Sequence, residues 1–290
     1  MNGEAFRIDK QLVRTAFDRA AARYDRMALL QREIGGRLLE RLDLMKVKPG
    51  CILDLGSGTG QITRAAAKRY RGAQVVAVDI AESMLRAARR GLRWWRRPAL
   101  VCGDIESLPV AAASVDMVLS NLSLQWCNDL GRVMAELRRV LRPGGVLLFT
   151  TLGPDTLKEL RASWAAVDSS NHVNAFLDMH DIGDAMLRAG LSDPVVDRED
   201  VTLTYPDLGR LMRDLKGIGA HNVTAGRPRG LTTPARIRKL ESAYEAYRRD
   251  DGLPANYEVI YGHAWMSQPA AVEIAVSRMC QTKHRRAGRP

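Results

Sequence analysis

Short apolar runs alternate along this chain with stretches in which apolar residues recur every three or four positions. The runs Cys51–Leu55, Gln74–Asp79, Ala99–Cys102, Val115–Ser120 and Val146–Thr151 predict buried strands. The periodic stretches Ile62–Tyr70, Ala81–Arg90 and Leu130–Leu141 predict helices between them. Such alternation predicts an α/β fold, a doubly wound, mostly parallel seven-stranded sheet with helices on both faces.

Further helices flank this central part of the chain. Asp9–Leu44 reads as one N-terminal helix, because no proline interrupts its apolar spacing. Later segments predict helices at Thr156–Val167, Asp181–Ala189, Asp207–Gly217 and Pro234–Arg249, and strands at Val195–Tyr205 and Tyr257–Trp265. We therefore expect a helical cap (1–45), a ligand-binding core (46–152), and the rest of the sheet (153–270) with inserted lid helices at about 206–250. The basic tail 271–290 is expected to lack fixed structure.

A glycine-rich loop follows the first predicted strand and precedes a helix. Asp54 closes the strand, and Gly56, Ser57, Gly58 and Gly60 form a GxGxG turn rather than the GxGxxG of dinucleotide-binding folds. Glycines let a backbone approach a ligand closely. A pyrophosphate would be repelled by Asp54, whereas the sulfonium and ammonium groups of S-adenosylmethionine (SAM) suit it. The loop therefore favours SAM as cofactor.

Other predicted strands also end in residues that suit a nucleoside. Asp79 can accept both ribose hydroxyls, and Asp104 can accept from an adenine amino group. Taken singly, each aspartate is equally consistent with a helix N-cap. Successive strand ends meet at one edge of an open α/β sheet, where ligands bind. We assign to the cofactor, besides the glycine loop, the residues at or just after strand ends, Asp79, Ile80, Asp104, Ile105 and Asn121, and Met84 of the helix that follows Asp79.

Together these motifs resemble class I SAM-dependent methyltransferases over roughly residues 45–152. A longer resemblance, from Phe17 to Trp265, is to the malonyl-acyl carrier protein O-methyltransferases of biotin synthesis. It rests on the stretches Phe17–Asp25, Gln31, Ser120–Trp126, Gly153–Arg161, Leu211–Asn222 and Tyr257–Trp265. The resemblance implies methylation of the free carboxylate of a malonyl thioester.

The resemblance also implies site residues. The family's active-site tyrosine corresponds to Tyr24, and Gln31, two turns further along the predicted helix, would face the same cleft and contact the cofactor. Trp126 is a candidate wall of the transfer pocket, and a packing role for it or for Tyr24 weighs equally. A malonyl carboxylate is ionised at neutral pH, so no general base is required. An arginine would be its natural partner; Arg227, Arg229 and His221-Asn222 lie near one another in the lid, and the sequence selects none.

Net charge and cysteine content limit the classes of binding partner, metal site and cellular setting that we expect. The chain has 44 Lys+Arg against 33 Asp+Glu, a net charge of +11, which suits a nucleic acid, an anionic membrane or an acidic protein, or is a bias toward arginine on a solvated surface. The resemblance implies the third, an acidic acyl carrier protein.

No apolar run is long enough to span a membrane, and no appended RNA-binding module accompanies the core. The four cysteines form no CxxC pair, so we expect no metal site and a reducing, cytoplasmic setting.

Other functions share these motifs. A methyltransferase acting on a quinone or another small molecule would have the same cofactor site. Respiratory-complex assembly factors that hydroxylate arginine also resemble the regions Leu122–Trp126 and Asp155–Arg161. A non-catalytic protein that keeps the fold is disfavoured by the intact Asp54, GxGxG and Asp79 set. An RNA methyltransferase is disfavoured because Asn121–Leu124 lacks the Asn-Pro-Pro-Tyr type of tetrapeptide.

Overall fold

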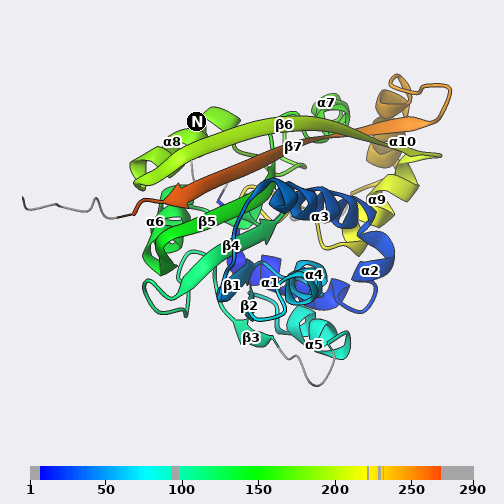
Figure 1. The fold of residues 1–290 in the computed structure, drawn as a ribbon. Helices are drawn as coiled ribbons and strands as arrows, with labels where there is room; N and C mark the ends of the chain where they lie inside the picture. Colours follow the sequence, from blue (N-terminus) through cyan, green and yellow to red (C-terminus); the bar gives the residue numbers. More distant parts are fainter. Residues whose placement is uncertain (1–6, 93–97, 221, 228–229, 231, 269–290) are drawn as a thin grey trace, which may run out of the picture.

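The computed structural model describes residues 7–92, 98–220, 222–227, 230 and 232–268. Its centre is one seven-stranded, mostly parallel sheet, as predicted, and the strands lie in the order β3-β2-β1-β4-β5-β7-β6 (Figure 1). β7 runs antiparallel to both of its neighbours, and the other paired strands are parallel. The strands are β1 (Cys51–Leu55), β2 (Gln74–Asp79), β3 (Ala99–Cys102), β4 (Val115–Asn121), β5 (Leu141–Leu152), β6 (Leu191–Tyr205) and β7 (Leu253–Met266).

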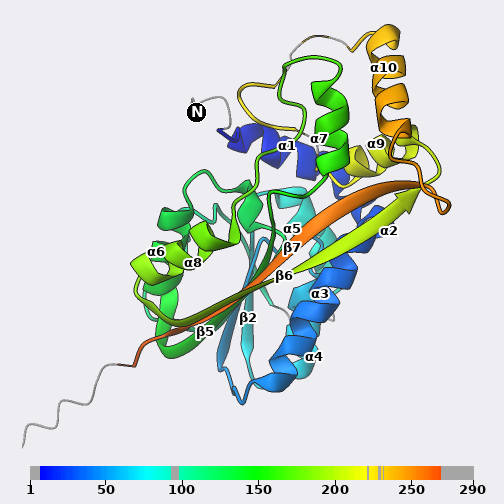
Figure 2. The same ribbon diagram turned by 90° about the horizontal axis from the view of Figure 1, so that it is seen from above.

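Helices cover both faces of this sheet. On one side lie α3 (Leu29–Arg41) and α4 (Gln61–Arg69), and on the other α6 (Leu130–Val140) and α8 (Met179–Arg188) (Figure 2). Each side has its own apolar core: Leu38 and Ile62 pack on one face, and Met134 and Met186 on the other. Burial on both faces explains why the parallel strands read as continuous apolar runs.

A further set of helices lies beyond the carboxyl ends of the strands. It comprises α1 (Lys10–Ala20), α2 (Tyr24–Met27), α7 (Lys158–Ala165), α9 (Leu208–Gly217) and α10 (Pro234–Glu245), while α5 (Glu82–Arg90) follows β2 (Figure 2). The long strands β6 and β7 extend past the rest of the sheet and support α9 and α10. There Tyr244 donates a hydrogen bond to the Pro254 carbonyl over 2.8 Å. The predicted lid segment thus forms α9, α10 and the loop between them.

The N-terminal chain reaches the lid loop directly. Asp9 N–H donates to Val223 O over 3.1 Å, and Ala225 N–H donates to Arg7 O over 2.8 Å. Asn128 adds a bond in each direction to the backbone of Ile8. Cap and lid are therefore joined by backbone hydrogen bonds above the sheet edge.

The single N-terminal helix predicted at Asp9–Leu44 is wrong, because the chain forms α1, α2, α3 and a short 3₁₀ turn at Leu42–Leu44. The reason is tertiary. Ala20 and Ala21 at the end of α1 pack on α5, whereas Leu30 and Leu38 of α3 pack in two other clusters. One straight rod cannot reach these surfaces, and tertiary packing overrides helix propensity. Among the described residues, no helix is long and apolar enough to cross a membrane.

Close packing at the sheet centre gives a stability prediction. Gly262 of β7 pairs with the fully buried Phe149 of β5, and a Cβ at Gly262 would lie 2.2 Å from Phe149 Cζ. We expect Gly262→Ala to lower the free energy of unfolding by about 1–3 kcal/mol, because the ring must leave its rotamer. Urea unfolding followed by circular dichroism measures this change.

The matched control is Gly36→Ala in α3, where a new Cβ meets no atom within 4 Å. Alanine favours a helix over glycine by about 0.5–1 kcal/mol, so this variant should be slightly more stable. Equal unfolding midpoints for the two variants would contradict the packing of Phe149 over Gly262.

Candidate functional site

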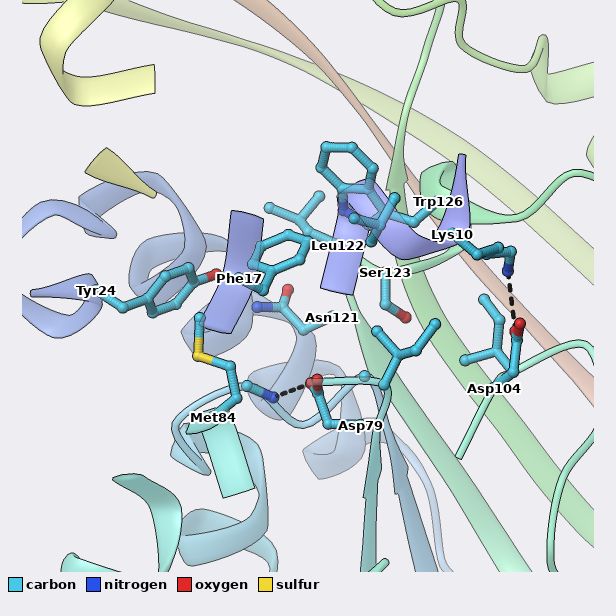
Figure 3. Close-up of a pocket in the computed structure, with 15 residues that line it drawn as sticks. Lys10, Phe17, Tyr24, Asp79, Met84, Asp104, Asn121, Leu122, Ser123 and Trp126 are labelled. Atoms are coloured by element: carbon cyan, nitrogen blue, oxygen red, sulfur yellow. Dashed lines mark hydrogen bonds and ion pairs between the residues drawn. The ribbon is translucent and has the colours of Figure 1, made fainter. Parts of the chain in front are cut away.

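A cavity opens at the carboxyl edge of the sheet, where β1 and β4 lie side by side. Connections from these two strands leave in opposite directions, which makes this the topological switch point at which α/β folds bind ligands. We call it the central cavity (Figure 3). It is lined by Lys10, Val13, Phe17, Tyr24, Gly56, Gly58, Asp79, Ile80, Met84, Asp104, Ile105, Asn121, Leu122, Ser123 and Trp126.

The glycine loop is shaped by its neighbours on both sides. Gly56 has φ +70°, and a Cβ there would lie 2.3 Å from the Cβ of Ser123, so both backbone and space require glycine. Gly60 has φ +83° and forms the N-cap of α4. The N–H groups of Gly56 and Ser57 both donate to Val78 O, over 2.8 and 3.0 Å. The loop is therefore bound to the end of β2.

The Asp79 carboxylate ties the glycine loop to the start of α5. Gly58 N–H donates to Oδ2 over 2.8 Å (Figure 3). Ala81 N–H donates to Oδ1, also over 2.8 Å. Burial raises the pKa of Asp79 to about 6, and these two hydrogen bonds oppose the rise. Each oxygen keeps further acceptor capacity toward the cavity.

Asp54 lies in a second cavity on the other side of the loop, the glycine-loop cavity. It is lined by Tyr24, Asp25, Ala28, Gln31, Arg32, Asp54, Gly56, Ser57, Gly58, Thr59, Gln61, Ile62, Arg64 and Asn121. The Asp54 carboxylate is 1% exposed and accepts from the Thr63 hydroxyl. Burial raises its pKa to about 7 despite that hydrogen bond. Asp25 of α2 accepts from the Thr59 hydroxyl over 2.5 Å, which fastens the cap to the glycine loop.

Asn121 holds the end of β4 to the cap. Its Nδ2 donates to the Gln31 backbone carbonyl over 2.9 Å, and its Oδ1 accepts from the Thr150 hydroxyl over 2.8 Å. Both ends of this side chain are thus bound within the protein. Gln31 itself has its side-chain Oε1 buried without a hydrogen-bond partner among the described residues.

A third, mainly apolar cavity adjoins the other two; we call it the acceptor cavity. Its lining is Phe17, Tyr24, Leu30, Gln31, Leu122, Gln125, Trp126, Leu152, Thr156, Leu157, Asn174, Phe176, Leu215, Ile218, Ala220 and Tyr257. Among the described residues, no Asp, Glu, Lys, Arg or His belongs to this lining. Its polar side-chain groups are two phenols, three carboxamides, one hydroxyl and the indole N–H of Trp126.

Tyr24 belongs to the lining of all three cavities. Its ring lies edge-on to Phe17 at 6.5 Å between centroids, and Phe17 lies edge-on to Trp126 at 5.3 Å. Burial, and after it the carboxylates of Asp79 and Asp25, raise the pKa of Tyr24 well above its usual value. The phenol is therefore a neutral hydrogen-bond donor where the three cavities meet.

The structure gathers the predicted site residues around these cavities, with one exception. Gly60 lines none of them, and its left-handed backbone starts α4 instead. Gln31 faces the cleft, but from α3 rather than from the helix of Tyr24 as expected. Asp104 lines the central cavity already paired with Lys10, whose Nζ lies 2.9 Å from Asp104 Oδ1 (Figure 3).

Several lining residues were not predicted as site residues. Lys10 and Val13 of α1 have no motif of their own. Phe17, Leu122 and Ser123 were noted only as part of the resemblance. Lys10, Val13 and Phe17 fall at three- and four-residue spacing on α1, so they lie on one face of the helix. That shared face is the feature of the sequence that could have identified them.

The remaining candidates do not join the site. Arg227 donates to the Thr224 carbonyl over 3.2 Å and lines none of the three cavities, while His221 and Arg229 lie outside the described residues, as does the tail 271–290. Within the described part of the chain, no three His, Cys, Asp or Glu side chains could hold a metal ion together. Cys51, Cys102 and Cys127 are free thiols.

Comparison with known proteins places the chain among methyltransferases. The family profile "Methyltransferase domain" matches residues 53–149. In the solved structures, a SAM-dependent methyltransferase from Thermotoga maritima is 18% identical with a TM-score of 0.52, over 88% of this chain and all of that one. At this identity the likeness shows the fold alone, and it agrees with the sheet order described above.

Two curated relatives are far more similar. The malonyl-acyl carrier protein O-methyltransferase of Laribacter hongkongensis is 54% identical over 276 residues, 92% of either chain. The protein of the same name from a Methylovorus species is 53% identical over 274 residues, 92% of this chain and 93% of that one. With relatives more than half identical along nine-tenths of its length, this chain belongs to the malonyl-acyl carrier protein O-methyltransferase family.

Proposed function

We propose that this methyltransferase uses SAM to convert the free carboxylate of malonyl-acyl carrier protein to its methyl ester, a step that would serve biotin synthesis. The relatives' names support this substrate. Masking the charge would let fatty-acid enzymes lengthen the chain as if it were apolar. The proposal also has to agree with the chemistry of the three cavities.

The residues present fit SAM. Asp54 is a deeply buried carboxylate whose partner in the protein is a hydroxyl, and an unpaired buried charge calls for a cation. Asp54 would face the ammonium of the cofactor's methionine part, and Asp79 the ribose hydroxyls. Ile80, Met84, Asp104 and Ile105 would surround the adenine. When bound, the cofactor supplies an electrophilic methyl group on a positively charged sulfur.

The position of Tyr24 is the observation that carries the proposal. In SAM the sulfonium joins the adenosine part to the methionine part. If these parts occupy the central and glycine-loop cavities, the sulfonium lies where those cavities meet, beside Tyr24, Gly56, Gly58 and Asn121. Of these four, Tyr24 also lines the acceptor cavity. The methyl group would therefore face that cavity.

The acceptor cavity favours a carboxylate as nucleophile. Burial raises the pKa of both phenols in its lining, Tyr24 and Tyr257, so neither serves as a base near neutral pH. A quinone precursor with a hydroxyl to methylate would need its proton removed, whereas a carboxylate arrives ionised. An uncharged wall also leaves the carboxylate poorly solvated and reactive, with the sulfonium as its counter-charge.

Two side chains are placed to hold the acceptor. The Tyr24 phenol can donate one hydrogen bond to it. The Gln31 carboxamide has one acceptor atom and two donor hydrogens, so it can accept from the cofactor's ammonium and donate to the acceptor carboxylate. Holding two reactants in line contributes on the order of 7–11 kcal/mol at best. Among the described residues no arginine lines this cavity, so we assign the carboxylate to neutral donors rather than to a bidentate arginine.

Purified protein with SAM should add one methyl group to malonyl-acyl carrier protein, visible as about 14 Da by intact mass spectrometry. Acetyl-carrier protein, which lacks the free carboxylate, is the matched control and should gain nothing. Methylation of a quinone precursor with no gain on the malonyl carrier would overturn the proposed substrate.

Affinity for SAM should fall as the pH drops from about 8 to about 6. Burial raises the pKa of Asp54 to about 7 and that of Asp79 to about 6. The ionised forms bind best, because Asp54 would attract the ammonium and Asp79 would accept from the ribose hydroxyls. Titration calorimetry measures the affinity at each pH. The Asp54→Asn variant should bind more weakly at pH 8 and lose the part of the dependence near pH 7. Titration of the cofactor's own amine changes the affinity of the wild-type protein and of the variant alike. Identical pH curves for the two proteins would therefore show that Asp54 does not face the cofactor's ammonium.

Tyr24→Phe should slow methyl transfer by roughly 10–100-fold at saturating substrates, because a hydrogen bond to a charged group contributes about 1.5–3 kcal/mol. Its affinity for SAM should stay within about threefold of the wild-type value, since the ring remains. Single-turnover kinetics with labelled SAM separates the rate of methyl transfer from the affinity for SAM. Tyr247→Phe, a change at an exposed residue in the turn after α10, controls for loss of a phenol. An unaltered rate for Tyr24→Phe would remove its donor role.

A further inference from the structure

A fourth and larger cavity, the outer cavity, lies between the cap and the lid and has a volume of about 560 Å³. α1 forms one wall, α9 another, and α7 with the segment after it the third; Figure 2 shows these helices together beyond the sheet. Its lining is Leu12, Thr15, Ala16, Arg19, Ala20, Arg23, Leu157, Leu160, Trp164, His172, Val173, Asn174, Phe176, Met212, Arg213, Leu215, Lys216, Ala220 and Asn222.

The outer cavity adjoins the acceptor cavity. Both are lined by Leu157, Asn174, Phe176, Leu215 and Ala220, which form a shared threshold between them. None of these five side chains is charged. A chain-like substrate that enters the outer cavity therefore meets an uncharged passage toward Tyr24.

Four cations stand around the outer cavity: Arg19, Arg23, Arg213 and Lys216, hereafter the basic quartet. All four are exposed. Arg19 lies near the end of α1 and Arg23 is the N-cap of α2, on either side of the turn between these helices. Arg213 and Lys216 lie three residues apart on one face of α9. Among the residues that the structure describes, no Asp or Glu lines this cavity.

The basic quartet differs from other cations of the same helices in its pairing. Lys10 lies 2.9 Å from Asp104, and Arg210 lies 3.4 Å from Asp214. Within the part of the chain that the structure describes, none of the quartet forms an ion pair with a carboxylate. Four unneutralised cations around one opening make a positive potential that attracts an anion.

The walls below the quartet suit an extended, mostly uncharged arm. Leu160, Val173 and Phe176 supply apolar surface, and Trp164 is stacked on His172 with ring centroids 3.6 Å apart. Asn174 and Asn222 add amide groups along the same walls. Such a lining fits a thin chain with amide linkages and a negative charge at its outer end.

We propose that the outer cavity is the entrance for the thioester-bearing arm of the carrier protein, and that the basic quartet binds the arm's phosphodiester and the acidic surface of the carrier around it. The inference rests on the proposed function and adds the route and the docking surface. A phosphopantetheine arm has a phosphodiester at its outer end, two amides along its length and the acyl thioester at its tip. The tip would pass the shared threshold into the acceptor cavity.

The test reverses charge on both sides of the opening. The double variant Arg19→Glu with Arg213→Glu is compared with Lys46→Glu with Lys48→Glu, an equal change in net charge on exposed residues just before β1, at the opposite edge of the sheet. For malonyl-carrier protein, kcat/KM should fall by about tenfold or more in the first variant relative to the second. The loss should lie mainly in KM, with SAM affinity and unfolding midpoint matching the control. The salt dependence of kcat/KM should also become weaker.

Two smaller substrates distinguish whether the basic quartet binds the arm's phosphate, the acidic surface of the carrier, or both. Malonyl-coenzyme A has a phosphate at the same place on its arm, as part of a pyrophosphate, and lacks the carrier. Malonyl-pantetheine has neither the phosphate nor the carrier. We expect the largest loss of kcat/KM with the carrier, a smaller one with malonyl-coenzyme A, and a value near the control with malonyl-pantetheine. Equal losses with the carrier and malonyl-coenzyme A would overturn carrier docking and keep the phosphodiester site.

The inference and the proposed function fail in different ways. Wild-type protein that does not methylate malonyl-carrier protein overturns the function itself. Wild-type activity together with a basic-quartet variant that matches its control overturns only the entrance. A variant that loses equal activity on all three substrates would mean that the basic quartet acts through the fold, which also contradicts the docking surface.

Discussion

The binding edge of this protein depends on one buried carboxylate. Asp79 accepts a hydrogen bond from Gly58 N–H on the glycine loop and another from Ala81 N–H before α5. The loop can take its shape only because glycines tolerate its left-handed turns, and it stays in place because β2 and Asp79 hold it. The same carboxylate retains acceptor capacity toward the cavity, so one group both organises the loop and presents a charge to the cofactor.

Charge is distributed in three zones along the path that we propose for the two substrates. Buried acids lie on the cofactor side, where Asp54 suits the ammonium and Asp79 the ribose hydroxyls. The described lining of the acceptor cavity holds no carboxylate, lysine, arginine or histidine. The basic quartet surrounds the outer opening. An anionic arm would therefore be attracted at the surface, lose water in the neutral passage, and meet its counter-charge only at the sulfonium.

Much of the site followed from local sequence signals. Strand ends at Asp54, Asp79, Asp104 and Asn121 can be read from apolar runs, and parallel strands necessarily bring such ends to one edge. The seven-stranded sheet was predicted for the same reason. The N-terminal helix was not, since nothing between Ala21 and Arg23 marks a break. The chain bends there because its two halves pack against different cores.

The sequence by itself therefore determined the fold class, the glycine loop and the set of acidic strand ends, because these depend on local periodicity and on backbone rules. Only the tertiary structure decided that Tyr24 lies where three cavities meet, that Lys10 pairs with Asp104, and that Arg227 does not line the acceptor cavity. Each of these depends on how α1, α2 and the lid pack over the sheet edge. Contacts between segments more than a hundred residues apart, such as Ile8 with Thr224, leave no local pattern in the chain.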